Sequence, residues 1–166
     1  MKLIQVTEPT LPISLEEVKT FLRVLHSEDD TRIQSLISSV AKMAMEYTNR
    51  QIGVATFELY LDDVGESIAL PRSPIGSLDG FDYFDGNTWV AMDYKFDDKS
   101  TPPLVYPEKS LGEDVNKYRL QFTAGYSTLP PSFKNWMLLK IEELYDGEVP
   151  KIDITPLLSS YRIANV

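Results

Sequence analysis

The stretch SLEEVKTFLRVLHSEDDTRIQSLISSVAKMAMEYTNR, residues 14–50, has the spacing of two consecutive amphipathic helices. Ser14 and Glu17 have the spacing of a capping box, which predicts that the first helix begins there. Apolar residues then recur at helical spacing, first Val18, Phe21, Leu22 and Leu25, and later Ile33, Leu36, Ile37, Val40, Ala41, Ala44 and Tyr47. Gly53 lies where the chain can leave the second helix in a left-handed conformation. Because stripes this wide need a cover, we expect the helices to pack on each other and on a later part of the chain.

The sequence after residue 54 has the patterns of strands and turns. Apolar and polar side chains alternate in residues 56–62 and again in residues 118–123, which is the spacing of half-buried strands. Asp85-Gly86-Asn87 predicts a tight turn between two further strands. Helical spacing returns in residues 129–146, so we expect this helix to be the partner of the first two.

These patterns predict one domain of the α+β class that is predominantly helical: a bundle of three main helices with a small antiparallel β lobe inserted into it. The expected parts are a helical hairpin at 14–53, a β-rich insertion at 54–128, a third helix at 129–146 and a tail at 147–166. Within the tail, a short helix can start at Thr155. Residues 1–13 contain Pro9 and Pro12 and predict an extended arm, which is either a frayed chain end or an arm that lies on a neighbouring subunit.

Composition excludes several classes of protein and site. The chain has no cysteine, which removes disulfides, thiolate zinc sites and cysteine nucleophiles. No apolar run reaches the length of a membrane span, and we expect no membrane partner. The net charge is -9, and most of it falls in residues 51–128, which carry 13 acidic and 6 basic side chains. Such a surface disfavours tight binding to nucleic acid. The acidic charge either only keeps the protein soluble or forms a surface to which passing DNA does not adhere.

The sequence predicts no catalytic, cofactor-binding or metal-binding residue. His26 is the only histidine, and we expect it in a surface loop. A group of aspartates is dense enough for acid/base chemistry or a hard cation, but its spacing matches no calcium loop and favours a solvated hairpin rim. Its members are Asp79, Asp82, Asp85, Asp93, Asp97 and Asp98. A set of aromatic residues could form either a face for stacking on a sugar or the core of a small sheet, which we favour. Its members are Tyr83, Phe84, Trp89, Tyr94 and Tyr106.

Several separated stretches resemble those of one protein family. They are Ser14-Leu15-Glu16-Glu17-Val18-Lys19, Glu28-Asp29-Asp30, Glu46-Tyr47-Thr48-Asn49-Arg50-Gln51-Ile52, Leu70-Pro71-Arg72-Ser73-Pro74-Ile75, Phe122-Thr123-Ala124-Gly125-Tyr126 and Leu129-Pro130-Pro131. In this order and spacing, from about residue 12 to 146, the chain resembles the head-tail connector proteins of tailed bacteriophages and prophages, also called head-completion or adaptor proteins. The acidic hairpin between Asp79 and Asp98 departs from the family pattern.

The resemblance implies a structural protein of the virion and no enzyme. Such proteins form a ring of roughly a dozen subunits, which needs a heterologous, head-to-tail interface. The ring lies under the portal protein at the capsid vertex, closes the DNA exit channel after packaging, and binds a neck or tail-completion protein. DNA passes through it without sequence-specific binding. The implied location is the virion neck, and the host cytoplasm during assembly. We expect the acidic lobe, including Asp97 and Asp98, to line the channel or to face a basic neck protein.

Two other classes of function remain open on the sequence. The first is a carbohydrate- or protein-binding module that uses the aromatic β lobe. The second is a hydrolase built on the aspartate group, which predicts two carboxylates converging in a cleft with a strongly perturbed pKa.

Overall fold

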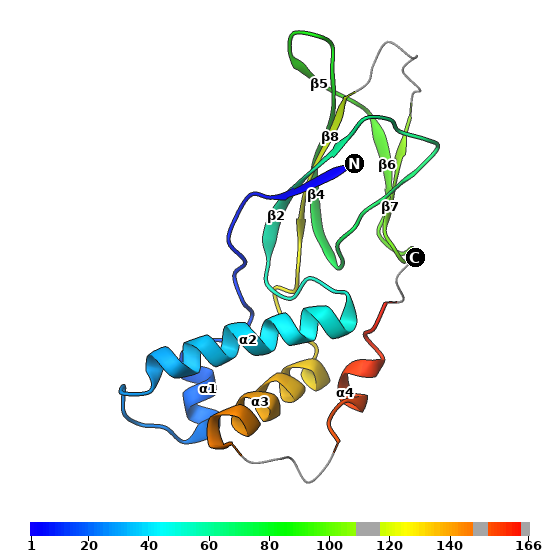
Figure 1. Ribbon diagram of the computed structural model, residues 1–166. Helices are drawn as coiled ribbons and strands as arrows, with labels where there is room; N and C mark the ends of the chain where they lie inside the picture. Colours follow the sequence, from blue (N-terminus) through cyan, green and yellow to red (C-terminus); the bar gives the residue numbers. More distant parts are fainter. Residues whose placement is uncertain (109–116, 148–152, 164–166) are drawn as a thin grey trace. The chain divides into compact units, whose positions relative to one another are not determined.

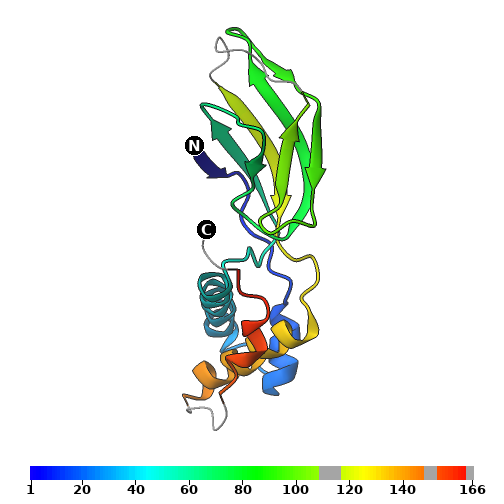
Figure 2. The same ribbon diagram turned by 90° about the vertical axis from the view of Figure 1, so that its right-hand side faces the viewer.

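The protein is represented by a computed structural model, which describes residues 1–108, 117–147 and 153–163. The chain divides into two compact units (Figures 1 and 2). The β unit contains Met1–Thr10 and Val54–Gly125, and the helical unit contains Leu11–Gly53 and Tyr126–Val166. Each unit has its own hydrophobic core. Among the described residues, no helix is both long and apolar enough to cross a membrane.

The helical unit consists of α1 (Leu15–Leu22), α2 (Asp30–Thr48), α3 (Pro131–Asp146) and α4 (Pro156–Ser159). The helical stripes predicted from the sequence form its core, with one exception. Leu25, expected in the stripe of the first helix, lies beyond the end of α1 at Leu22 and is 97% exposed. The fully enclosed side chains include Val18, Ile33, Ile37, Val40, Ala44, Phe133, Met137 and Ile141. Leu158 of α4 is also buried, so the predicted short helix of the tail is present and packs into the same core.

The helix ends in this unit follow from local hydrogen bonding. Ser14 Oγ accepts a hydrogen bond from the Glu17 N–H at 3.2 Å, which confirms the predicted start of α1. The predicted role of Gly53 is wrong, because α2 ends at Thr48 and is capped by Asn49, which has a φ of 57°. The Asn49 N–H donates to the Met45 carbonyl at 2.8 Å. Asparagine is the residue other than glycine that most readily adopts this left-handed conformation.

The β unit has eight strands among its described residues. They are β1 (Lys2–Gln5), β2 (Ala55–Leu61), β3 (Ile68–Ala69), β4 (Ile75–Phe84), β5 (Trp89–Ala91), β6 (Tyr94–Asp97), β7 (Leu104–Pro107) and β8 (Tyr118–Ala124). They form a five-stranded sheet in the order β1-β2-β8-β4-β5 and a three-stranded sheet in the order β3-β7-β6. Every pairing is antiparallel.

The core of the β unit comes from the alternation that the sequence shows in β2 and β8. Both strands alternate strictly between buried and half-buried residues, and their register pairs Phe57 with Phe122 and Leu59 with Leu120. The rings of Phe57 and Phe122 stack with their centroids 5.5 Å apart. Residues from the second sheet, such as Val105, belong to the same core.

The predicted fold class is wrong in its balance of helix and strand. Strands occupy almost as many described residues as helices, so the chain is not predominantly helical and is not a helical bundle with a small lobe. Two features escape local patterns. The arm predicted at residues 1–13 supplies β1, which pairs with β2 in the register Lys2 to Tyr60. The short strands of the second sheet cover the apolar side of the first and complete a core.

Candidate interaction surface

The five-stranded sheet has a second face, which points away from the core and carries polar and aromatic side chains. We call it the outer face, and its residues are Lys2, Ile4, Glu58, Tyr60, Asp82, Phe84, Trp89, Arg119 and Gln121. Directly opposite residues in an antiparallel pair lie on the same side of the sheet. The register therefore places Lys2, Tyr60, Arg119 and Asp82 in one row across four strands.

Arg119 is at the centre of this face. Its Nε and one terminal nitrogen donate to Asp82 Oδ2 at 3.2 and 2.7 Å. Its guanidinium carbon lies 4.7 Å from the centroid of the Trp89 ring, a cation–π contact. The side chains of Arg119 and Asp82 are only 21% and 16% exposed, so water screens this pair less than an ordinary surface ion pair. Arg119 is therefore a fixed part of the surface.

Glu58 and its neighbours continue the network on the same face. The Gln121 side-chain amide donates to Glu58 Oε1 at 2.9 Å, and the Tyr60 hydroxyl donates to Glu58 Oε2 at 2.8 Å. These two hydrogen bonds lower the pKa of the Glu58 carboxyl. The same bond to Glu58 raises the pKa of the Tyr60 hydroxyl, because it stabilises the protonated form. The Tyr60 ring meets Trp89 edge-on at 6.0 Å, which joins this group to Arg119.

A pocket of about 530 Å³ lies within the β unit beside this network. Its lining includes the apolar and aromatic side chains of Ile4, Tyr60 and Trp89. It also includes Lys2 and Lys117, whose side chains are exposed. The Met1 ammonium pairs with Asp62 at 3.3 Å in the same place. The pocket thus combines an apolar and aromatic lining with a local excess of positive charge, in a chain whose net charge is -9.

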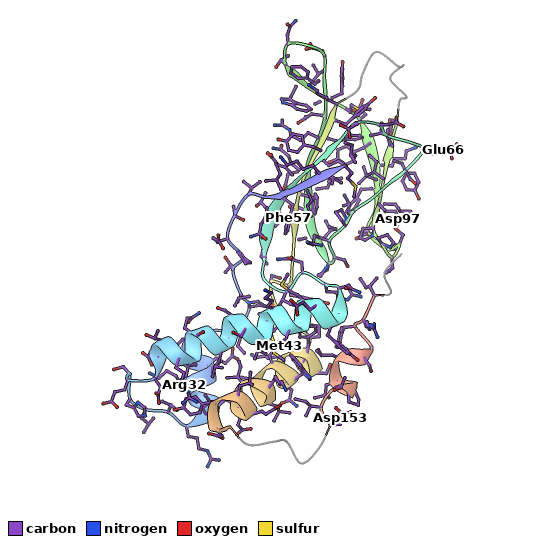
Figure 3. The ribbon with its side chains drawn as sticks, in the orientation of Figure 1. Arg32, Met43, Phe57, Glu66, Asp97 and Asp153 are labelled. Carbon is purple, nitrogen blue, oxygen red and sulfur yellow. The ribbon has the colours of Figure 1, made fainter. Side chains whose placement is uncertain are left out.

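The aspartate group predicted from the sequence does not converge. Asp82 pairs with Arg119, and Asp79 accepts from the hydroxyls of Ser77 and Thr123. Two other members cap turns through backbone N–H groups. Asp85 accepts from Asn87 and Thr88, and Asp97, at the end of β6 (Figure 3), accepts from Lys99 and Ser100. The described residues contain no group of three or more side chains placed to hold a metal ion.

The aromatic set is divided between the two sheets of the β unit and, within the five-stranded sheet, between its two faces. Tyr83 and Tyr94 pack against the core of the β unit, as a sheet-core interpretation requires. Phe84 and Trp89 lie on the outer face with their ring centroids 5.4 Å apart. Tyr106 is 37% exposed on β7 of the other sheet. The structure therefore does not gather these five residues on one face.

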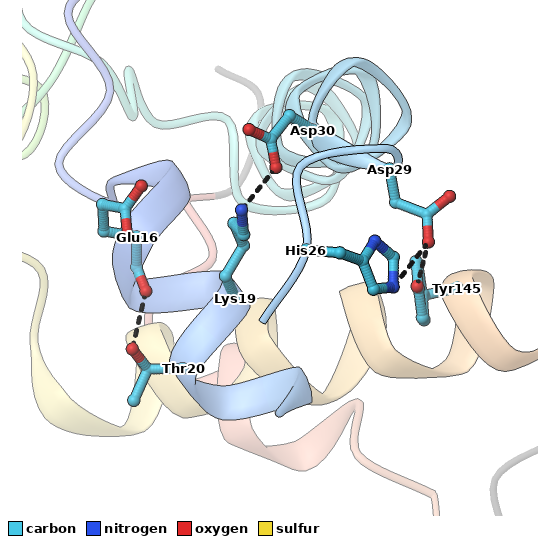
Figure 4. Close-up of polar contacts among 7 residues, drawn as sticks. All are labelled: Glu16, Lys19, Thr20, His26, Asp29, Asp30 and Tyr145. Carbon is cyan, nitrogen blue, oxygen red and sulfur yellow. Dashed lines mark hydrogen bonds and ion pairs between the residues drawn. The ribbon is translucent and has the colours of Figure 1, made fainter. Parts of the chain in front are cut away.

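His26 lies in an exposed loop of the helical unit, between α1 and α2 (Figure 4). Its Nε2 is 3.8 Å from Asp29 Oδ2, which also accepts a hydrogen bond from the Tyr145 hydroxyl at 2.6 Å. This bond raises the pKa of Tyr145. Nearby, Lys19 Nζ donates to Asp30 Oδ1 at 2.6 Å. These contacts tie the loop to α3 and α1, which is a structural role.

The sequence analysis did not predict the network on the outer face, although the alternation in β2 and β8 was visible. Because the apolar residues of these two strands face the core, their polar residues had to lie together on the opposite face. Their partners across the sheet depend on register, which a local pattern does not contain.

The comparisons with known proteins agree with the resemblance found in the sequence. Residues 12–76 match the model of the phage gp6-like head-tail connector protein family. A chain from the neck of an empty gene transfer agent (GTA) particle computed with C6 symmetry has 17% sequence identity and a TM-score of 0.80, with 100% of this chain and 97% of that chain covered. A chain from the virion of a native GTA particle gives 18% identity, a TM-score of 0.80 and the same coverage.

A chain from the neck of a native GTA particle computed with C12 symmetry has 18% identity and a TM-score of 0.78, again covering 100% of this chain and 97% of that one. No curated protein matches the sequence. The predicted resemblance to phage head-tail connector proteins is thus confirmed, and the fold of both units is that of these neck chains.

Proposed function

We propose that this protein is a structural component of a phage-like particle that joins the head to the tail or neck. The observation that carries the proposal is the agreement of the whole chain with neck chains, at a TM-score of 0.80 over 100% of its length. The family match over residues 12–76 supports the same role independently of the structure. The proposal assigns no catalytic residue, cofactor or metal.

In this proposal the chain acts as a single connector domain that assembles into a ring of roughly a dozen copies at the portal vertex, through one repeated heterologous interface. The symmetries of the GTA neck structures, C6 and C12, support a ring of this order. The ring binds the portal protein on one side and a neck or tail-completion protein on the other, and closes the exit channel after packaging. It acts in the virion neck after assembly in the host cytoplasm.

The charge of the chain suits a channel through which DNA moves. A net charge of -9 repels phosphate groups, so passing DNA gains little from contact with the protein. We propose that the acidic lobe lines this channel or faces a basic neck protein. Asp93 and Asp98 suit a test, because both are exposed and neither side chain caps a turn. Asp97 is a poorer choice, since its carboxylate holds the loop through Lys99 and Ser100.

The experiment that tests the function uses the full chain and its cognate portal protein. Light scattering coupled to size-exclusion chromatography, run over a wide range of concentration, should show a ring either alone or in complex with the portal. Failure to co-elute with the portal, together with a monomer at every concentration, would remove the connector proposal. Asp93→Lys with Asp98→Lys should leave ring formation intact and increase retention of packaged DNA, because lysines attract the phosphate groups that the aspartates repel. Unchanged retention would exclude the acidic-channel proposal alone.

A further inference from the structure

Leu25 is the most exposed large apolar side chain in the described part of the helical unit, at 97%. It belongs to the loop between α1 and α2, which begins after Arg23 in a left-handed conformation with a φ of 58°. The residue before it, Val24, packs against the core and donates its N–H to the Lys19 carbonyl at 3.0 Å. On the other side, Asp29 is held by Tyr145. The loop is therefore fixed at both ends and presents Leu25 to solvent.

The same loop carries an exposed carboxylate. Glu28 is three residues after Leu25 and, within the described part of the chain, has no ion-pair partner. Isolated apolar residues on a surface are common and need no explanation. An apolar side chain on a fixed loop with a nearby unpaired carboxylate has the composition of an interface anchor, in which an apolar group fills a pocket and a charge orients it.

The pocket of the β unit has the complementary composition. Ile4, Tyr60 and Trp89 supply an apolar and aromatic lining, and its volume of about 530 Å³ exceeds what one aliphatic side chain needs. Lys2 and Lys117 are exposed beside it and have no carboxylate within ion-pair distance among the described residues. The network around Arg119 holds Tyr60 and Trp89 in place, so an incoming group finds the lining already ordered.

We propose that the loop of one copy docks into the pocket of the next copy, with Leu25 in the pocket and Glu28 paired with Lys2 or Lys117. The two surfaces are different parts of the same chain, so the contact is heterologous and repeats around a ring. The inference rests on the proposed connector function and names the residues that join neighbouring subunits.

A mixing experiment tests this contact directly. Leu25→Asp removes the apolar anchor and leaves the pocket, whereas Lys2→Glu with Lys117→Glu reverses the charge of the pocket and leaves the loop. Each variant alone should self-associate at least about 10-fold more weakly than the wild type, the loss expected when a central interface contact is removed. An equal mixture of the two should form one-to-one dimers, because one intact loop meets one intact pocket. Sedimentation measures all three samples, with any purification tag at the C-terminus because Met1 lines the pocket.

Matched controls separate the specific contact from surface charge in general. Met43 is 39% exposed on α2, so Met43→Asp makes the same apolar-to-acidic change away from the loop and should leave association unchanged. Glu28→Lys combined with the two lysine reversals restores opposite charges and should recover most of the lost association. Failure of this rescue, with the single-surface variants folded and weak, would overturn the pairing of Glu28 with the lysines.

Tryptophan fluorescence gives a second readout. The chain has two tryptophans, and Trp136→Phe leaves Trp89 in the pocket as the only reporter. Association should shift the Trp89 emission, and Leu25→Asp should abolish the shift.

The outcomes separate this inference from the function on which it rests. If rings form equally well with Leu25→Asp and with the lysine reversals, the proposed contact is wrong and the connector function stands. If the wild type assembles only on the portal, the same variants are compared there, and equal numbers of bound copies again overturn the contact. If no assembly occurs in either setting, the connector function itself fails.

Discussion

The two units of the chain achieve their order in different ways. In the helical unit the stripes of α1, α2 and α3 meet in an aliphatic core, and the polar contacts are mostly pairs between neighbouring elements, such as Lys19 with Asp30. In the β unit a core of buried apolar side chains lies on one side of the five-stranded sheet. A connected polar and aromatic network lies on the other side. We infer that the network on the outer face contributes more to the stability of the β unit than an exposed ion pair, such as Lys134 with Glu17, contributes to the helical unit.

The largest expected effect tests whether the two cores are independent. Phe122→Ala in the β unit and Phe133→Ala in the helical unit each remove a fully buried ring and should cost about 3–5 kcal/mol of unfolding free energy. Because Trp89 and Trp136 belong to different units, single-tryptophan variants report each unit separately in denaturant. Each substitution should lower the denaturant concentration at the unfolding midpoint of its own unit more than that of the other unit. Equal shifts at both tryptophans would show that the units unfold as one.

The next effect compares one ion pair from each unit. Arg119→Met leaves the poorly exposed Asp82 carboxylate without its partner and should cost about 2 kcal/mol, the range for hydrogen bonds to charged groups. The matched change Lys134→Met removes the more exposed partner of Glu17, with side chains 37% and 36% exposed, and should cost less than about 0.5 kcal/mol. Urea unfolding of both variants measures the difference. An equal loss of unfolding free energy in the two variants would contradict the inference that the Arg119–Asp82 pair stabilises the protein more than an exposed ion pair.

A smaller effect concerns the start of α1. Ser14→Ala removes the acceptor for the Glu17 N–H and should cost about 1 kcal/mol. Ser39→Ala, at an exposed position within α2, serves as the control and should be neutral or slightly stabilising, because alanine is the better helix former. Urea unfolding measures both variants. If Ser14→Ala lowers the unfolding free energy no more than the control does, the stability of α1 comes from its packing alone.

The smallest effect depends on pH. Hydrogen bonds from Gln121 and Tyr60 lower the pKa of Glu58 in the folded protein. Its stabilising contribution is therefore present above the pKa of the unfolded chain and is lost as the pH falls through the folded pKa. Glu58→Gln should flatten the acid side of the pH–stability curve by a few tenths of a kcal/mol. Glu8→Gln, at an exposed position outside the network, should leave the curve unchanged.

Local patterns predicted the parts of the fold that depend on nearby residues. The Ser14 cap, the stripe through Ile33 and Ile37, and the alternation around Phe57 and Phe122 were all evident in the sequence, because helix and strand periods decide which side chains can be buried together. The end of α2 was misplaced, since asparagine and glycine both adopt a left-handed conformation and the pattern did not choose between them.

The parts that depend on distant residues could not be predicted in the same way. β1 has only four residues, and its partner Tyr60 is far along the chain from Lys2. The outer face needs side chains from several strands in one register, so Trp89, Arg119 and Tyr60 are neighbours only after the sheet has formed. The pocket has the same origin. The candidate site was therefore not evident before the structure, whereas the family resemblance was.

The order in which the strands pair bears on synthesis of the chain. β1 and β2 emerge early from the ribosome, but β8, which pairs with β2, comes only at Tyr118–Ala124. The loop that presents Leu25 is held by Tyr145, which comes later still. A nascent chain therefore lacks a finished pocket and a fixed loop until most of it has been made. If neighbouring copies join through these two surfaces, as proposed above, copies growing side by side on one messenger RNA cannot join before the last helices have been made.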